Sequence, residues 1–399
     1  AGTHPLLGRR LRSAQLIFEA ELSANSPAYL GEHLVAGAAI LPAAAYVEMA
    51  LAAATQAPGS GPYSLTELEL QKALFLPESG TRTVQVTLSP NTPGEQQFHL
   101  YSCPGGMDQP QALWTLHATG KLQHDPVDPS SPAPGPSVEE IQARCAEQIS
   151  GRNFYLKLHD QGLQYGPVFQ GIGWLWRRDG EALCQLEVPR TLRPEMEVYQ
   201  VHPAILDPCF QVLAATLPLK ALEGGGVFLP AGIGRVRVYG RPTGHLWGHA
   251  RLQSSIESNS NLAEGDVHLL AEDGRTLAQI TGLRLQRLSL DTQPGNKGTG
   301  GLTREAFFAV EPERRLRLLE TYLQTELARV LEIEPAQIGL HQPLRSIGLD
   351  SLLAIELKSL IEASLDVKLP LMSLFEEPTI SRLANQLLQL LLGHERRTV

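Results

Sequence analysis

The sequence has few cysteines, and they are scattered. Its 399 residues contain four, with no C-x-x-C pair and no cluster of histidines beside them. This pattern argues against a bound metal such as zinc and against a disulfide framework, so a reducing cytoplasm is the expected compartment. The four are Cys103, Cys145, Cys184 and Cys209.

An excess of positive charge and long apolar runs are also lacking. Thirty-three Lys and Arg face 42 Asp and Glu, a net charge of −9, which argues against nucleic acid as a partner because a phosphate backbone attracts a basic face. No apolar run reaches the roughly 18 to 20 residues of a membrane-spanning helix. The nearest, ILPAAAYVEMALAAA at 40–54, is interrupted by Glu48 and predicts a buried helix. The first ten residues lack the order of a signal peptide and are typical of a start within a longer polypeptide.

Two polar stretches rich in proline or glycine divide the chain. Residues 124–137 contain five prolines and predict an extended linker, and residues 291–302 are Gly-rich and predict a flexible one. The expected domains are therefore 1–123, 138–290 and 303–393.

The first two segments share an order of elements, an apolar central helix followed by strand-like runs. Alternation of apolar and polar residues is clear at 236–240 (VRVYG) and 282–288 (GLRLQRL). We expect two α+β units, each with a curved sheet around one helix. The second unit should open with an amphipathic helix over 138–149 and place its central helix after the sequence HPAILDP, with Pro208 in the first turn.

The third segment has a different pattern. Apolar residues recur at helical spacing, which predicts a small bundle of three or four helices. Those of the first helix are Leu316, Leu319, Leu323, Leu327 and Val330.

Within that bundle, SIGLDSLLAIELKSL places Ser351 directly before an apolar helix. A helix N-cap is one explanation of this serine. The succession of a first helix, a long loop, G-L-D-S-L and a further helix over 303–392 strongly resembles an acyl carrier protein. The resemblance implies that a phosphopantetheinyl transferase attaches 4′-phosphopantetheine to Ser351, with no nucleotide or metal cofactor.

Two residues upstream are candidates for acid–base chemistry. His33 begins H-x-x-x-G-x-x-x-x-P, with Gly37 and Pro42 at the defined positions, and Asp207 begins D-x-x-x-Q, with Gln211 four residues on. Taken singly, His33 is an ordinary histidine beside a core helix and Asp207 a helix cap.

The two patterns with Tyr165 and the YGPVFQG stretch between them resemble the dehydratase domains of modular polyketide synthases, over about residues 4–290. The resemblance implies a double hotdog fold followed by an all-α carrier bundle. It also implies elimination of water from a 3-hydroxyacyl thioester on the carrier, with His33 as base and Asp207 as acid. Gln211, Tyr165, Gly37 and Pro42 would position the substrate, the Gly37 N–H by polarising the thioester carbonyl. The expected partners are the acyl thioester, other polyketide synthase domains and a second copy in a homodimer, without nucleic acid or membrane.

One stretch departs from the family. An aromatic-rich L-P-F-x-W run is replaced by FLPAGIG, with Ala231 and Ile233 at the aromatic positions, which puts substrate shape rather than chemistry in question. A double-bond shift, an oxygen-ring closure and a catalytically idle scaffold are the alternative functions. His202 is predicted to be structural.

The acid role requires a protonated Asp207. A helix N-terminus would lower the pKa of this carboxyl, whereas burial among residues such as Ile205, Leu206 and Phe210 would raise it. We expect burial to dominate.

Overall fold

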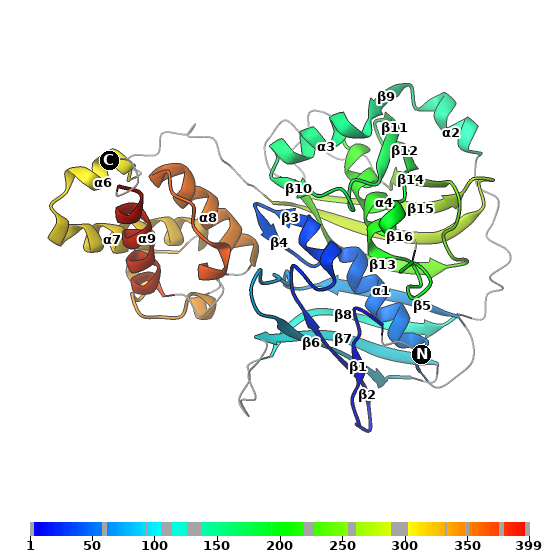
Figure 1. Cartoon of the computed structure of the whole chain (residues 1–399), viewed down its shortest axis with the longest axis horizontal. Helices are drawn as coiled ribbons and strands as arrows, with labels where there is room; N and C mark the ends of the chain where they lie inside the picture. Colours follow the sequence, from blue (N-terminus) through cyan, green and yellow to red (C-terminus); the bar gives the residue numbers. More distant parts are fainter. Residues whose placement is uncertain are drawn as a thin grey trace. The chain divides into compact units, whose positions relative to one another are not determined.

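A computed structural model of the chain divides into two compact units, Ala1–Leu288 and Ser289–Val399, which are treated separately below (Figure 1). The structure describes residues 4–57, 62–92, 94–104, 114–125, 137–192, 194–218, 227–253, 261–288, 302–331, 333–347, 349, 351–374 and 379–395. Most of both predicted linkers lies outside these ranges. No helix in the described ranges is both long and apolar enough to cross a membrane.

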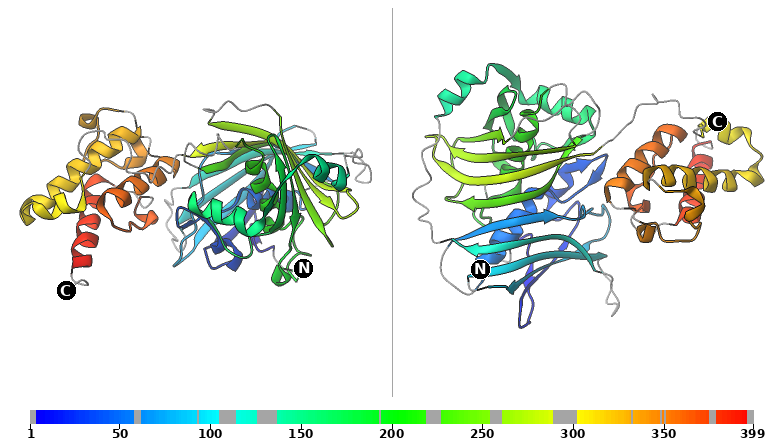
Figure 2. Two further views of the ribbon diagram at one scale, coloured as in Figure 1. Left: turned by 90° about the horizontal axis from the view of Figure 1, so that it is seen from above. Right: turned by 180° about the vertical axis from the view of Figure 1, so that it is seen from behind.

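The first unit is built on one antiparallel sheet, in which the strands of the two halves follow one another (Figure 2). Strands β5 and β13 join the halves, with Leu65 opposite Val236. The strands of the first half are β1 (Arg9–Arg10), β2 (Leu16–Leu22), β5 (Tyr63–Leu70), β6 (Arg82–Pro90), β7 (Glu95–Pro104) and β8 (Thr115–His124). Those of the second half are β9 (Glu147–Ser150), β11 (Ile172–Arg178), β12 (Glu181–Leu186), β13 (Val227–Val238), β14 (Leu246–Leu252), β15 (Leu262–Ala271) and β16 (Thr276–Leu288). Their order across the sheet is β1-β2-β6-β7-β8-β5-β13-β16-β15-β14-β12-β11-β9.

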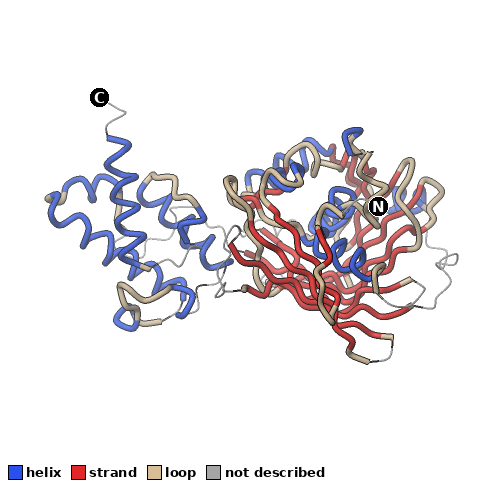
Figure 3. Tube along the Cα trace, turned by 60° about the horizontal axis from the view of Figure 1, so that its bottom comes forward, coloured by secondary structure: helices blue, strands red, loops and turns tan. Residues whose placement is uncertain are grey.

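Each half of the sheet packs on one central helix, and Figure 3 shows the strands as a curved layer around helices. Helix α1 (Ala43–Ala54) packs on β5, β6 and β8, and α4 (Pro203–Ala215) packs on β12, β14 and β15. All twelve residues of α1 are buried, as expected of a helix that is apolar except for Glu48. The two helices also contact each other, so the predicted double hotdog is confirmed.

A carboxylate in the middle of α1 is stabilised by three donors. Glu48 is 1% exposed, and it accepts hydrogen bonds from His4 Nε2 at 3.0 Å and from the backbone N–H groups of Gln200 and Val201 at 2.9 and 2.8 Å. Buried charge is tolerated only with such partners. Glu48 therefore ties the N-terminal segment and the approach to α4 onto α1.

Two predicted helix boundaries in the second half are wrong. Helix α2 (Val138–Arg144) begins as expected, with a capping box between Ser137 and Glu140, but it ends at Arg144. The chain turns at Cys145 and continues as β9, because backbone pairing with β11 replaces the last helical turns. Helix α3 (Gly151–Asp160) follows, and η2 (Arg190–Leu192) is a short 3-10 turn before α4.

Helix α4 begins five residues earlier than predicted. His202 is its N-cap, with Nδ1 accepting the N–H of Ala204, and Pro203 is the first helical residue. Pro208 therefore lies inside the helix and not in its first turn. A side chain on Gly171 would meet the Pro208 ring at 2.9 Å, so a bare backbone at residue 171 makes room for this proline.

A small second sheet carries the site. It has the order β10-β3-β4, formed by β10 (Leu163–Tyr165), β3 (His33–Val35) and β4 (Ala38–Ala39), and a 3-10 turn, η1 (Ala28–Glu32), leads into β3. This sheet joins the first half of the unit to the second, since β3 and β4 come before α1 and β10 follows α3.

Every regular element in the described residues of the second unit is a helix or a 3-10 turn, which confirms the predicted bundle. Helix α7 packs against α8 and α9, and three of its predicted leucines, Leu319, Leu323 and Leu327, are at most 1% exposed. Its helices are α6 (Arg304–Ala309), α7 (Pro312–Leu331), α8 (Ser351–Leu365) and α9 (Ile380–Glu395), with 3-10 turns η3 (Pro335–Gln337), η4 (Leu344–Ile347) and η5 (Leu371–Leu374).

Candidate active site

The fold brings His33 and Asp207 together, one from each half of the first unit. His33 is the first residue of β3, and Asp207 lies four residues after the start of α4. His33 Nε2 and Asp207 Oδ2 are 3.9 Å apart, and the two residues are 7% and 4% exposed. Residues 174 positions apart in sequence thus form one buried acid–base pair.

The backbone determines which nitrogen of His33 carries a proton. Nδ1 lies 3.0 Å from the carbonyl oxygen of Ile40, and a carbonyl can only accept. Nδ1 is therefore the protonated nitrogen of the neutral ring, and Nε2 keeps its lone pair on the side of Asp207. This is the tautomer that a general base needs.

Two aromatic rings flank His33. Tyr165 is its partner in the pairing of β10 with β3, and the ring centroids of Tyr165 and Phe169 both lie 5.3 Å from that of His33. Burial raises the pKa of Tyr165 well above its usual value, so its hydroxyl stays protonated. The sequence singled out Tyr165 but not Phe169, which is fully buried and is hard to distinguish from an ordinary core residue.

The pKa of Asp207 is raised from its ordinary value. Burial is the largest cause, and the proximity of His33 and a hydrogen bond from Gln211 act in the opposite direction. Because α4 starts before Asp207, the carboxyl lies beyond the first turn, where the effect of the helix dipole is concentrated. The expectation that burial dominates is confirmed in direction.

Gln211 lies one turn after Asp207 on the same face of α4. Its Nε2 donates to Asp207 Oδ2 at 2.8 Å and to the Phe169 carbonyl oxygen at 3.2 Å. Its Oε1 accepts a hydrogen bond from the Tyr155 hydroxyl at 3.0 Å. Sequence reasoning missed Tyr155, because the helical spacing of Phe154, Tyr155 and Leu158 indicates only a core face of α3.

Gly37 lies in a turn, and Pro42 lies at the start of a helix. Gly37 has a φ of +79° at the turn between β3 and β4, and its N–H donates to Gln164 Oε1 at 2.9 Å. A substrate carbonyl would have to displace that amide to be polarised by Gly37 as predicted. Pro42 is buried and is the N-cap of α1.

The residues that replace the family's aromatic positions lie on β13. Ile233 is 1% exposed and Ala231 is half-buried, next to a break in the register between Pro230 and Gly232. Both residues are part of the main sheet, and neither is His33 or Asp207 or a hydrogen-bond partner named above for them.

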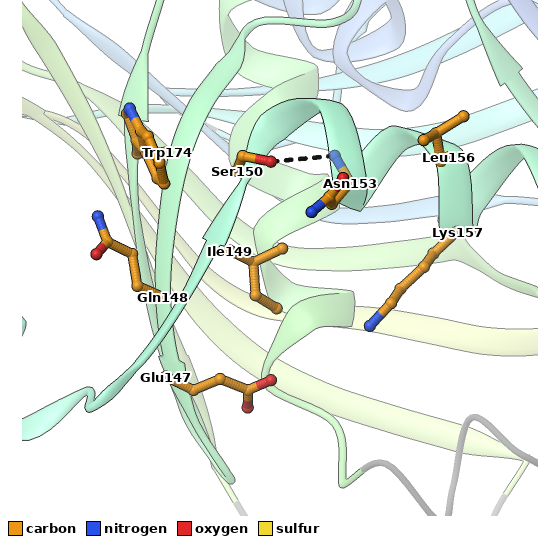
Figure 4. Close-up of a pocket in the computed structure, with 8 residues that line it drawn as sticks. All are labelled: Glu147, Gln148, Ile149, Ser150, Asn153, Leu156, Lys157 and Trp174. Carbon is orange, nitrogen blue, oxygen red and sulfur yellow. Dashed lines mark hydrogen bonds between the residues drawn. The ribbon is translucent and has the colours of Figure 1, made fainter.

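A surface hollow of about 550 Å³ lies elsewhere on the second half, between β9, the start of α3 and β11 (Figure 4). It shares no residue with the pair. Its lining includes Trp174 and Leu156, which are 44% and 54% exposed.

Ser351 is the first residue of α8. Leu349 before it and Ala354 and Leu357 after it are buried, so they anchor this end of the helix in the bundle. Gly348 and Asp350 of the G-L-D-S-L run lie outside the described residues.

A buried histidine on β3 and a buried aspartate on α4 thus lie close together within a double hotdog fold. Comparison with known proteins gives the family. The model described as polyketide synthase dehydratase domain matches residues 4–103, and the one described as polyketide synthase dehydratase N-terminal domain matches residues 133–294. A phosphopantetheine attachment site matches residues 321–387.

Solved structures and curated proteins agree. The dehydratase domain from the CurF module of curacin polyketide synthase has 29% identity and a TM-score of 0.64, over 71% of this chain and 99% of that one. An inactive aspartate-to-asparagine mutant of the CurK dehydratase has 30% identity and a TM-score of 0.63, over 71% and 99%. A mycocerosic acid synthase-like polyketide synthase of Mycobacterium tuberculosis is 29% identical over 71% of this chain and 13% of its own length. Spectinabilin polyketide synthase system protein NorB of Streptomyces orinoci is 35% identical over 59% and 10%.

The chain belongs to the polyketide synthase dehydratase family, and a phosphopantetheine-binding carrier domain follows its dehydratase domain. It spans about a tenth of the length of these curated relatives.

Proposed function

We propose that the dehydratase domain removes water from a 3-hydroxyacyl thioester held on the carrier domain and leaves the 2,3-enoyl thioester. The observation that carries this proposal is the buried pair of His33 and Asp207, with a free Nε2 lone pair facing a carboxyl of raised pKa. Two inactive mutants of the CurK dehydratase, one histidine-to-phenylalanine and one aspartate-to-asparagine, support the assignment of an acid–base pair.

His33 acts as the base. Its Nε2 takes a proton from C2 of the substrate, and the electrons of that C–H bond form the C2–C3 double bond. The Ile40 carbonyl stabilises the imidazolium that results, because it already accepts the Nδ1 proton.

Asp207 acts as the acid. As the C3–O bond breaks, the leaving oxygen takes the carboxyl proton and departs as water, since hydroxide itself is a poor leaving group. Gln211 donates to Oδ2, which favours the acidic proton on Oδ1 because a carbonyl-type oxygen is the better acceptor. The cycle is completed when His33 loses its proton and Asp207 regains one; since 3.9 Å separates Nε2 from Oδ2, this return runs through a water molecule.

Ser351 is the proposed attachment residue of the carrier. It opens α8 within the matched range 321–387, and a serine hydroxyl can form the required phosphodiester. When attached, 4′-phosphopantetheine supplies a thiol that holds the acyl chain as a thioester. A phosphopantetheinyl transferase is the implied partner; that partner, the homodimer and the cytoplasmic compartment stay predictions.

The test follows the mass of the carrier-bound chain. Full-length protein is loaded at Ser351 with a 3-hydroxyacyl-pantetheine, and intact mass spectrometry should show loss of one water in the wild type. His33→Phe and Asp207→Asn should keep the loaded mass, and Ser351→Ala should not load.

Other outcomes identify the rival functions. The rivals need a 2,3-enoyl chain on Ser351 as substrate: an isomeric product of unchanged mass would then indicate a double-bond shift or, with a chain that carries a further hydroxyl, ring closure by the same pair. No change of any kind across several acyl chains would indicate an idle dehydratase beside a working carrier.

Glu32, which directly precedes His33, is expected to hold in place a loop that packs against His33. Its Oε2 accepts the Val168 N–H at 2.7 Å, and its carbonyl oxygen accepts the Gly166 N–H at 2.7 Å. It thereby holds the loop between the two rings that flank His33. Glu32→Ala should slow dehydration about tenfold through loss of this charged hydrogen bond.

The matched control is Glu32→Gln, which keeps an oxygen acceptor for Val168. Single-turnover rates of the two variants should differ clearly, with Glu32→Gln near the wild type. Equal rates for both would show that the loop holds its place without Glu32.

A further inference from the structure

Tyr155 of α3 forms a hydrogen bond to Gln211, the side chain that donates to Asp207. Its hydroxyl oxygen accepts the Ile172 N–H at 3.0 Å and lies 3.0 Å from Gln211 Oε1 and 3.2 Å from the Phe169 carbonyl oxygen. The residue is 6% exposed, so water does not compete freely for these bonds.

The direction of every bond in this chain follows from its fixed ends. The Ile172 N–H can only donate and the Phe169 carbonyl can only accept. Tyr155 therefore accepts a hydrogen bond from the backbone, and its own O–H donates to Gln211 Oε1 at 3.0 Å, with the Phe169 carbonyl as a second, longer acceptor. This leaves the Gln211 NH₂ group to donate to Phe169 and Asp207.

We propose that Tyr155 is a positioning residue for the dehydration: it fixes the Gln211 amide with its N–H toward Asp207, and so sets the orientation and proton affinity of the acid. The inference rests on the proposed function, in which Asp207 is the proton donor. Without the tyrosine hydroxyl, Gln211 Oε1 and the Ile172 N–H lose their buried partner, and the amide that donates to Asp207 is held more loosely, with the Phe169 carbonyl still accepting from it.

Few other groups near Asp207 compete for this role. Four titratable side chains interact by charge with Asp207: His33 on β3, Tyr155 on α3, Tyr165 on β10 and Cys209 on α4. Cys209 also interacts with Cys184 on β12. Burial raises the pKa of both tyrosines and both cysteines, so all four are neutral near pH 7.

Two further buried titratable groups on elements packed against α4 have partners of their own. Glu48 on α1 binds His4. His249 on β14 binds Glu181 and stacks on His268 of β15.

The first measurement needs no turnover. Full-length protein with ¹³C-labelled aspartate carboxyls is titrated by NMR, and the Asp207 signal is assigned by its loss in Asp207→Asn. An N–H donated to a carboxylate favours the ionised form. Tyr155→Phe should therefore raise the pKa of Asp207 further, by about half a unit to one unit.

The second measurement is a double-mutant cycle on single-turnover dehydration. Tyr155→Phe should slow the reaction about tenfold in the wild-type background, and have little further effect in Gln211→Ala, because Tyr155 acts through Gln211. Tyr46→Phe is the matched control: Tyr46 is also buried and its hydroxyl also bonds to backbone, at Leu74, but on α1. It should leave the rate and the Asp207 titration unchanged.

The outcomes separate the two proposals. A shifted Asp207 titration and a non-additive cycle support the role of Tyr155. An unchanged titration, or rate losses that multiply in the double variant, would overturn it even if the wild type dehydrates its substrate. A wild type that never dehydrates would overturn the proposed function, and with it this role in dehydration, whatever the titration shows about the hydrogen-bond chain.

Discussion

Asparagine at position 207 should slow dehydration by about 10²- to 10⁴-fold, the range in which a positioned general acid contributes. An amide fills the same space and still accepts the Gln211 N–H, but it has no acidic proton to give to the leaving oxygen. Single-turnover rates on the loaded carrier, read by rapid quench and mass, measure the effect.

The pH dependence gives this prediction a second readout. Burial raises the folded-state pKa of Asp207, so the carboxyl favours folding while it is protonated and opposes it once pH rises through that pKa. Asp207→Asn removes this dependence and should be at least as stable as the wild type at pH 8 in thermal unfolding. A rate within tenfold of the wild type would place the acid elsewhere, and a lower melting temperature at pH 8 would contradict the buried, raised carboxyl.

Removal of Glu181 should cost the dehydratase domain about 2–4 kcal/mol of unfolding free energy. This carboxylate on β12 is 1% exposed and binds Arg144 of α2 at 2.5 Å, Arg178 of β11 at 2.8 Å and His249 of β14 at 2.9 Å. Glu181→Ala leaves three polar side chains without their acceptor. The figure is below that for a fully buried pair because Arg144 and Arg178 reach solvent. Chemical denaturation measures it.

The same carboxylate makes acid stability testable. Its three partners lower the pKa of Glu181 from 4.5 to about 2, against an opposing effect of burial. Its stabilisation is therefore present above about pH 4.5 and is lost as pH falls toward 2. The wild type should lose more stability over that range than Glu181→Gln. Glu67→Gln, which removes an exposed partner of Lys121, should lose as much as the wild type. Parallel losses in all three would refute the assignment.

The local pattern of apolar residues was sufficient to predict the helices that are held in place by burial of those same residues. The helix at 43–54 is apolar except for Glu48 and is buried on every side, and Leu319, Leu323 and Leu327 of α7 are buried in the bundle as their spacing predicts. The same approach failed at α2 and α4. The end of α2 depends on β9 pairing with β11, and α4 starts at Pro203 and continues through Pro208, whose ring lies close to the backbone of Gly171.

The sequence by itself determined the chemistry that this chain offers: a histidine and an aspartate in two recognisable motifs, ahead of a serine in a carrier motif. Only the tertiary structure decided how these groups are set. The tautomer of His33, the raised pKa of Asp207 and the hydrogen-bond chain through Gln211 and Tyr155 all depend on burial and on partners up to 174 residues away along the chain. Hydrogen bonds and desolvation act through space, and no local spacing of residues encodes them.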